Sequence, residues 1–334
     1  MKKIYLVFTL MFAALLAACG SLSQQDVVDK LTTNLDDAAS YLASGQMTID
    51  SDGQEFIYQV EVAFQQPDLY RVSMRNETTN NEQIILKNDE GVFVLTPALN
   101  KKFKFQSDWP LSSSQVYLYQ SLLADILNDT GATFLADDSG YTFTTAANYH
   151  GNSDLASQTV RFCPEKLVPL SAQVMDTAGE VRMSMSFDEF NFNADMPEGF
   201  FDSETVMQQT VSTMGEGYVE MVDLASIELF PSLPEGTSLT DRSHIELENG
   251  NRVILTFSGE QVFTIIQENA QARGDFSIEP VSGDLVFING SIGALSHNSV
   301  TWINNGVEFF LVSDTLETDG LLSVAKSIGT FYQK

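Results

Sequence analysis

The residues of this chain that could do chemistry are few and widely separated. The three histidines, His150, His244 and His297, lie far apart in sequence and show none of the short spacings that hold a metal ion. No serine stands in a G-x-S-x-G turn, and no glycine-rich loop is arranged to hold a phosphate. We therefore expect no catalytic residue, no metal site and no cofactor, and we predict that the protein is not an enzyme.

Acidic pairs are the remaining chemical candidates. Asp137-Asp138 and Asp188-Glu189 are sequence neighbours, and neighbours on a strand point to opposite faces. That is poor geometry for hydrolysis by two carboxylates. Asp50 and Asp52 stand before Gly53, but the other ligand positions of a calcium loop are missing, so we interpret this segment as a hairpin turn.

Cys19 has the most informative surroundings of the two cysteines. It follows the basic residues Lys2 and Lys3, an apolar run over residues 4–16 and two alanines, which is the layout of a secretory signal peptide. The apolar run is short for a membrane-spanning helix. A cysteine thiol in this place can carry a lipid, and the alternative is an ordinary signal peptide that happens to contain a cysteine.

The sequence L-A-A-C-G around Cys19 resembles a bacterial lipobox, which implies lipidation of Cys19 as the first mature residue. We therefore expect a signal peptide over residues 1–18 and a tether over 19–24. Several acyl chains, at about 0.8 kcal/mol per buried methylene, would anchor the protein to the cytoplasmic membrane on its extracytoplasmic face.

Composition indicates a globular, strongly acidic protein. The chain has 334 residues, of which 43% are hydrophobic, and this length suits two domains. A formal net charge of −28 repels nucleic acid, so we expect no nucleic-acid partner. Cys163 has no partner once Cys19 is acylated, and we interpret it as a small buried hydrophobe on a strand.

Strand patterns dominate the first part of the chain. Between residues 56 and 64 apolar and mostly polar residues alternate, and the alternation resumes from Tyr70 to Met74. Further short apolar runs at 84–86, 92–95 and 103–105 are separated by polar turns. This pattern predicts an antiparallel meander with one apolar face that another element must cover.

Two segments have helical periodicity and could supply that cover. In residues 24–44 apolar side chains recur as far as Leu42, with Ser23 as a cap and Gly45 as the end. In residues 112–131 the stripe includes Val116 and Ile126, Ser112 to Ser114 offer caps, and Gly131 ends the segment.

Further strands and a helical stripe are predicted in the rest of the chain. Strands near 141–144, 159–162 and 181–187 close the first domain. Residues 206–225 form a linker or a connecting helix, and residues 226–334 form a second module of short strands with a closing helical stripe at Leu321, Val324 or Ala325, and Ile328.

Several segments in this order resemble the LolA family of bacterial outer-membrane lipoprotein carriers, especially lipidated Gram-positive forms. They are PDLYRVSM (67–74), IILKNDEGVFVLTPALNKKF (84–103), the second helical segment and FNFNADMPEGF (190–200). The resemblance covers residues 25–205. It implies an α+β fold in which helices plug an open antiparallel half-barrel, with a cavity for acyl chains. The second module resembles a small extracytoplasmic α+β domain family without assigned chemistry, DUF4367.

The resemblance implies two sets of site residues. The acyl-cavity wall is Phe56, Tyr58, Val60, Val62, Phe64, Tyr70, Val72, Met74, Met183 and Met185, and the lid is Val116, Tyr119, Leu122, Leu123 and Ile126. Ordinary core packing is the other interpretation of each residue. The family has an arginine before the strand-leading proline that bonds to the lid, whereas this chain has Gln66, which can still bond to backbone carbonyls.

Two hypotheses for function follow. The first is a membrane-anchored extracytoplasmic lipoprotein that binds acyl chains of lipoproteins or lipids as a carrier, acceptor or sensor. The second is a regulatory or scaffold lipoprotein, of the anti-sigma-binding or sporulation type, that acts through a membrane-protein partner.

Overall fold

The computed structural model describes residues 22–51, 53–110, 113–149, 152–214, 224, 229–248, 250–270 and 277–328. The predicted signal peptide and Cys19 lie outside these residues. Asp52, Ser112, His150 and most of the second half of the predicted linker lie outside them as well. Within the described part, no helix is long and apolar enough to cross a bilayer.

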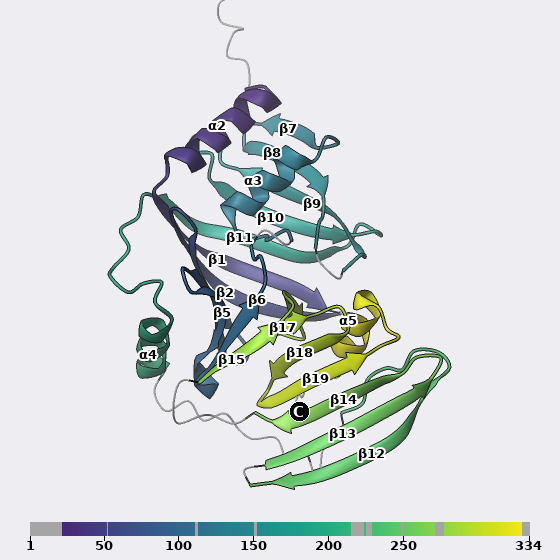
Figure 1. Cartoon of the computed structure of the whole chain (residues 1–334). Helices are drawn as coiled ribbons and strands as arrows, with labels where there is room; N and C mark the ends of the chain where they lie inside the picture. The colour runs from purple at the N-terminus through teal and green to yellow at the C-terminus, as the bar shows by residue number, and fades with distance from the viewer. Residues whose placement is uncertain are drawn as a thin grey trace, which may run out of the picture.

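A twelve-stranded sheet forms the larger part of the molecule, with the strand order β15-β6-β5-β4-β3-β2-β1-β11-β10-β9-β8-β7 (Figure 1). Its strands are β1 (Ser40–Ser51), β2 (Gln54–Gln65), β3 (Leu69–Asn76), β4 (Glu82–Asn88), β5 (Gly91–Thr96), β6 (Lys101–Gln106), β7 (Thr133–Asp137), β8 (Gly140–Ala146), β9 (Leu155–Phe162), β10 (Pro169–Asp176), β11 (Val181–Phe192) and β15 (Ser277–Ser282). Among the described strands of this sheet, only β15 and β6 pair in parallel. The sheet is open, as predicted.

The predicted alternation on β2 and β3 is confirmed. Val60 lies opposite Met74, Val62 opposite Val72 and Phe64 opposite Tyr70, and all of these side chains are buried. Residues directly opposite on an antiparallel pair share one face of the sheet. We call this face, which carries the largest core cluster, the inner face.

Helix α2 (Gln24–Asp37) begins where predicted but ends early. Ser23 and Asp26 form a capping box at its start. The expectation that the helix continues to Gly45 is wrong, because residues 40–51 form β1 and hydrogen-bond with both β2 and β11. Gly45 instead lies at a bulge, where a Cβ atom would stand 2.0 Å from the carbonyl oxygen of Ser186.

Helix α3 (Tyr119–Asn128) is the predicted lid helix, but it starts later than expected. Its N-cap is Leu118, which makes no side-chain cap bond, so the predicted serine caps are wrong. Ser114 instead donates from its hydroxyl to Asp125 at 2.9 Å. Val116 precedes the helix and is nonetheless buried. The short 3-10 helix η1 (Pro97–Leu99) joins β5 to β6.

Helix α4 (Ser203–Met214) occupies the first half of the predicted linker and covers the opposite, outer face. Its Val206 and Met207 are buried with Ile84, Leu86 and Phe93 of β4 and β5. The sheet therefore has apolar side chains on both faces here, which explains the continuous apolar runs in these two strands.

A seven-stranded sheet forms the second module, in the order β12-β13-β14-β19-β18-β17-β16. Its strands are β12 (Thr237–Leu247), β13 (Gly250–Gly259), β14 (Phe263–Asn269), β16 (Asp284–Ile288), β17 (Ser291–Leu295), β18 (Ser299–Asn304) and β19 (Val307–Ser313). Helix α5 (Thr318–Ser327) buries the predicted stripe of Leu321, Val324 and Ala325 against this sheet. The smaller α+β module is thus confirmed in its fold class.

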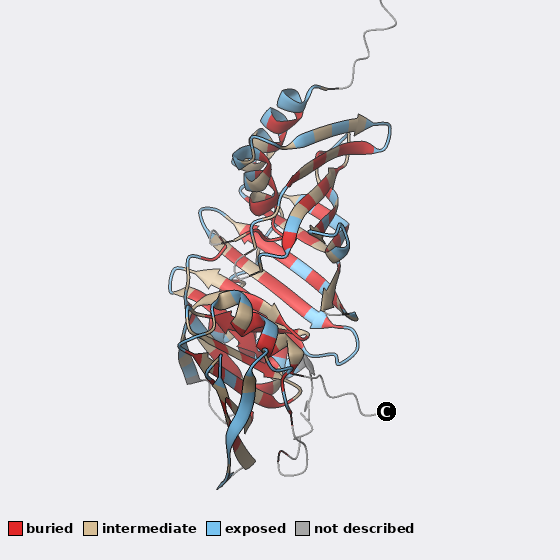
Figure 2. Cartoon of the chain, turned by 90° about the vertical axis from the view of Figure 1, so that its right-hand side faces the viewer, coloured by how far each residue is buried: buried red, intermediate tan, exposed pale blue. Residues whose placement is uncertain are grey.

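The second module also reaches into the first sheet, which the sequence patterns did not indicate. Strand β15 extends the large sheet beside β6, and Ile292 and Ala294 of β17 belong to the inner-face core cluster. Figure 2 shows buried residues on the strands of both modules. The predicted domain limits at 205 and 226 stay predictions. Each module has its own core cluster, and Ile292 and Ala294 of the second module are buried in that of the first.

Candidate functional site

The predicted wall and lid residues come together on the inner face. Every residue of both sets is buried, with at most 8% of its surface exposed, and all of them belong to one core cluster. The structure therefore brings these side chains together. In this structure the wall and lid side chains contact one another. Acyl binding by these residues therefore stays a prediction.

Helices α2 and α3 cover one part of the inner face, and we call them the helical cover. The Tyr119 hydroxyl lies 3.2 Å from the carbonyl oxygen of Leu31 and 3.3 Å from that of Leu167. Its ring packs 5.6 Å from that of Phe190, centroid to centroid. Burial raises the pKa of Tyr119 above the range in which it would ionise. The Tyr119 hydroxyl therefore acts as a neutral link between α3 and the rest of the fold.

Gln66 takes part in this cover. Its side-chain nitrogen donates to the carbonyl oxygen of Ala38 at 2.9 Å and to that of Asp36 at 3.3 Å. These are carbonyl groups at the end of α2, which the helix itself leaves without partners. The Gln66 side chain therefore holds the end of α2 by hydrogen bonds to backbone carbonyls, as the sequence predicted. Arg71 and Arg75 point elsewhere, toward Phe200 and Glu82.

The turn between β16 and β17 covers the other part of the inner face, and we call this hairpin the hairpin cover. Asn289 and Gly290 both have positive φ, 46° and 83°, as a two-residue Asn-Gly turn requires. Gly290 lies flat against Phe56, because a Cβ atom there would stand 2.6 Å from the ring.

Side-chain amides hold the hairpin cover on both sides. The Gln83 side-chain oxygen accepts from the backbone N–H of Ile292 at 2.7 Å, and its nitrogen lies 3.5 Å from the Ile292 carbonyl oxygen. The Asn289 side chain donates to the carbonyl oxygens of Lys326 and Ile328, each at 2.9 Å. The hairpin is therefore tied to β4 of the first sheet and to the end of α5.

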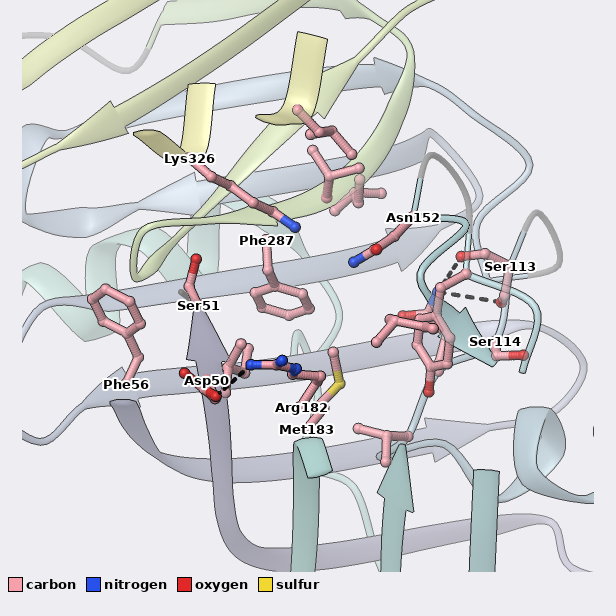
Figure 3. Close-up of a pocket in the computed structure, with 18 of the residues that line it drawn as sticks. Asp50, Ser51, Phe56, Ser113, Ser114, Asn152, Arg182, Met183, Phe287 and Lys326 are labelled. Atoms are coloured by element: carbon pink, nitrogen blue, oxygen red, sulfur yellow. Dashed lines mark hydrogen bonds and ion pairs between the residues drawn. The ribbon is translucent and has the colours of Figure 1, made fainter. Parts of the chain in front are cut away.

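Two cavities remain at the junction, on either side of Phe56, Tyr58 and the Asn289-Gly290 turn. The first, drawn in Figure 3, has a volume of about 90 Å³ and is lined by residues of both modules, including Met183, Phe287 and Lys326. The second measures about 220 Å³. Pockets for drug-sized ligands hold roughly 300–1,000 Å³. Neither cavity offers the room of a long acyl chain.

Arg182 is one of the charged residues that line the first cavity, and the sequence patterns did not point to it. Its guanidinium lies 2.9 Å from Asp50 and 2.8 Å from Asp176. Backbone N–H donation by Glu180, followed by the bond from Arg182, lowers the pKa of Asp176. The lowered pKa keeps the Asp176 carboxylate charged near neutral pH, and both it and Asp50 form ion pairs with Arg182.

The other chemical candidates stay apart. His244 is exposed on β12 and pairs with Asn251 at 3.0 Å, His297 lies in the turn before β18, and Asp188 and Glu189 are exposed on β11. No group of metal-binding side chains occurs among the described residues. The interpretation of Cys163 is wrong, because this half-buried cysteine follows the end of β9 rather than lying within a strand.

Comparison with known proteins gives one match over the whole chain. Sporulation protein YdcC of Bacillus subtilis (strain 168) is 39% identical over 336 residues, covering 98% of each chain. The sequence profile of the sporulation protein YdcC-like family matches residues 1–201.

Similarity to solved structures is weaker. The complex of Pseudomonas aeruginosa MucA/MucB has 12% identity and a TM-score of 0.34, covering 92% of this chain and 100% of that one. LolA superfamily protein NE2245 from Nitrosomonas europaea has 11% identity and a TM-score of 0.32, covering 55% of this chain and 99% of that one. No argument about function rests on similarities at this level. The Bacillus subtilis protein, by contrast, matches nearly the whole sequence at 39% identity. The chain therefore belongs to the sporulation protein YdcC-like family.

Proposed function

We propose that this protein is a membrane-anchored, extracytoplasmic sporulation lipoprotein that acts without catalysis, as a scaffold or regulator that binds a protein partner. The family and the name of its Bacillus subtilis relative support the sporulation role. The L-A-A-C-G motif at Cys19 supports the anchor and the location.

The observation that carries the partner-binding role is the filled inner face. The chain's own helical cover and hairpin cover occupy the surface that an acyl carrier would leave open. The cavities of about 90 and about 220 Å³ that remain lie at the junction of the modules. A protein with a packed interior and few chemical side chains acts through its surface.

Capture of partners from membranes tests this role. Tagged full-length protein, expressed in its sporulating host, is cross-linked, solubilised with detergent and purified, and bound proteins are identified and quantified. We expect one membrane protein in stoichiometric amount that remains after lipid is washed away. A Cys19→Ala variant, recovered from the soluble fraction, tests the anchor. Recovery of the tagged full-length protein without any bound membrane protein would contradict the partner-binding role.

Acyl binding is the second candidate, and it requires the hairpin cover to leave the inner face. Phe287 and Ile292 place apolar side chains against the inner face, where they take the space that an acyl chain would need. Displacing the hairpin would expose the predicted wall from Phe56 to Met74. Mass spectrometry of organic extracts from the purified protein tests this candidate. Lipid in molar amount would favour it, and a lipid-free protein that still captures its partner would exclude it.

A further inference from the structure

The junction cavity of about 220 Å³ beside the hairpin cover is assembled from four turns, two from each module. The first sheet contributes the loop between β3 and β4 and the segment at η1, and the second module contributes the turns between β16 and β17 and between β18 and β19. Junctions between modules are common places for ligand sites. A cavity of this size suits a ligand smaller than a typical drug.

The lining has an apolar floor and an uncharged polar wall. Phe56, Tyr58, Met74, Leu99 and Ile303 form the floor. The wall carries side-chain amides and hydroxyls, which each both donate and accept hydrogen bonds. They are Asn76, Thr78, Thr79, Asn81, Gln83, Thr96, Asn289, Ser291, Asn304 and Asn305.

Several of these polar groups are already used within the fold. Asn76 accepts from the backbone of Thr78 and Thr79, and Gln83 and Asn289 hold the hairpin cover. In the part of the chain that the structure describes, Thr96 is different. It is only 8% exposed, and its hydroxyl is buried without a hydrogen-bond partner. A buried hydroxyl without a partner destabilises the fold, and a ligand that bonds to it would remove that cost.

Two further amides are available at the same cavity. The side chains of Asn81 on the β3–β4 side and Asn305 in the β18–β19 turn make no hydrogen bond within the described residues. Asn81 is exposed and Asn305 is half-buried. The free donors and acceptors therefore come from both modules and face a common space.

The charges around the cavity restrict the ligand. No lysine, arginine or histidine is among the described residues that line it, so nothing there attracts an anion. Glu82 is the one carboxylate in this lining, and it already bonds to Ser73 and to Arg75. Hydrolysis of a glycoside by the common mechanism needs two carboxylates across the bond, so this lining suits binding rather than cleavage.

We propose that this cavity is a binding site for a neutral saccharide. A sugar ring offers hydroxyls that donate and accept, as the amides and Thr96 require, and its apolar C–H face suits the floor of Phe56 and Tyr58. The ring is neutral, in keeping with the lining. This site is separate from the partner-binding role, because it needs neither the anchor nor a protein partner.

Titration calorimetry of the full-length protein with N-acetylglucosamine, a single neutral sugar ring, tests the proposal. A zwitterionic detergent keeps the protein soluble, so that no sugar headgroup competes. We expect saturable binding with a millimolar dissociation constant, and no binding of glucuronic acid, whose carboxylate finds no cation in the cavity. No saturable binding of N-acetylglucosamine or of glucose, or equal binding of a neutral acetylated dipeptide, would overturn the proposal.

Matched variants then locate the site. Thr96→Val removes the buried hydroxyl with little change in shape, and Asn81→Leu removes an exposed amide. Each should weaken binding about tenfold, the effect of one lost hydrogen bond. Asn191→Leu, an exposed amide on β11 outside the cavity, is the control and should leave binding unchanged. Circular dichroism confirms that the variants fold, and an equal affinity for all three variants would place the sugar elsewhere.

Discussion

The helical cover and the hairpin cover close the same inner face by different means. The helical cover is built from residues close to the first sheet in sequence and buries large side chains such as Tyr119 and Leu122 completely. The hairpin cover comes from about two hundred residues further on and is fixed by the amides of Gln83 and Asn289. The two cavities described above lie beside the hairpin cover. Because cavities adjoin the hairpin cover, we expect it to open more readily than the helical cover.

The largest expected effect comes from the helical cover. Leu122→Ala should lower the free energy of unfolding by about 2–5 kcal/mol, because it removes a fully buried side chain and leaves a cavity. Leu127→Ala on the same helix is the control. That side chain is 53% exposed, so the change should stay within about 0.5 kcal/mol. Urea unfolding followed by fluorescence measures both, and similar losses would show that α3 is not packed as described.

The turn of the hairpin cover should be sensitive to a single methyl group. Gly290→Ala should lower the free energy of unfolding by about 2–4 kcal/mol, since it combines a left-handed backbone with a contact against Phe56. Gly179→Ala is the control, because Gly179 has a φ of +85° but no atom within 4 Å of the added group. It should cost about 1–2 kcal/mol from the backbone alone. Equal losses would mean that Gly290 does not press on Phe56.

The amide link to β4 should have a smaller effect on global stability and a larger one on local opening. Gln83→Leu leaves the buried N–H of Ile292 without its partner, which costs about 1–3 kcal/mol. Hydrogen exchange of the amides in residues 284–295 should accelerate more than exchange in α3. Gln173→Leu, at an exposed position on β10, should change neither. Uniform acceleration over both covers would contradict separate opening of the hairpin.

The smallest effect concerns pH and the polar link within the helical cover. Burial raises the pKa of Asp125, which accepts from Ser114 and Gln158. The folded state therefore holds this proton more tightly than the unfolded state does. Its contribution to stability is full below the ordinary pKa of 3.8 and is lost as pH rises through the raised value. The advantage of the parent protein over Asp125→Asn should thus shrink from acid toward neutral pH, in urea unfolding at each pH.

Asp129, one turn further on, gives a control of opposite sign. Its pKa is lowered, first by the backbone N–H of Ala146 and then by that of Gly131. Its contribution to stability is present above pH 3.8 and is lost as pH falls through the lowered value. Asp129→Asn should therefore reduce stability at neutral pH and converge with the parent protein in acid. The stability difference from the parent protein should change with pH in opposite directions for the two variants. A change in the same direction would show that burial does not raise the pKa of Asp125.

The sequence predicted the elements that depend on local periodicity. The alternation from Phe56 to Met74 and the stripe around Leu321 appear in the structure as strands and a helix. The stripe from Leu31 to Leu42 was ambiguous, because spacings of three and four residues also occur by chance in a strand such as β1. The predicted serine caps do not form at the start of α3. The Ser114 hydroxyl donates a hydrogen bond to Asp125 instead.

The sequence by itself determined the charge, the antiparallel strands, the apolar face and the helix that covers part of it, since these follow from residue type and short-range period. That the sheet is open was implied by the family resemblance. Only the tertiary structure decided what fills the rest of that face. The meeting of Gln83 with Ile292 and of Phe56 with Gly290 joins segments more than two hundred residues apart, and no local pattern encodes such contacts. Those contacts turn the predicted acyl wall into a covered core with a small polar cavity beside it.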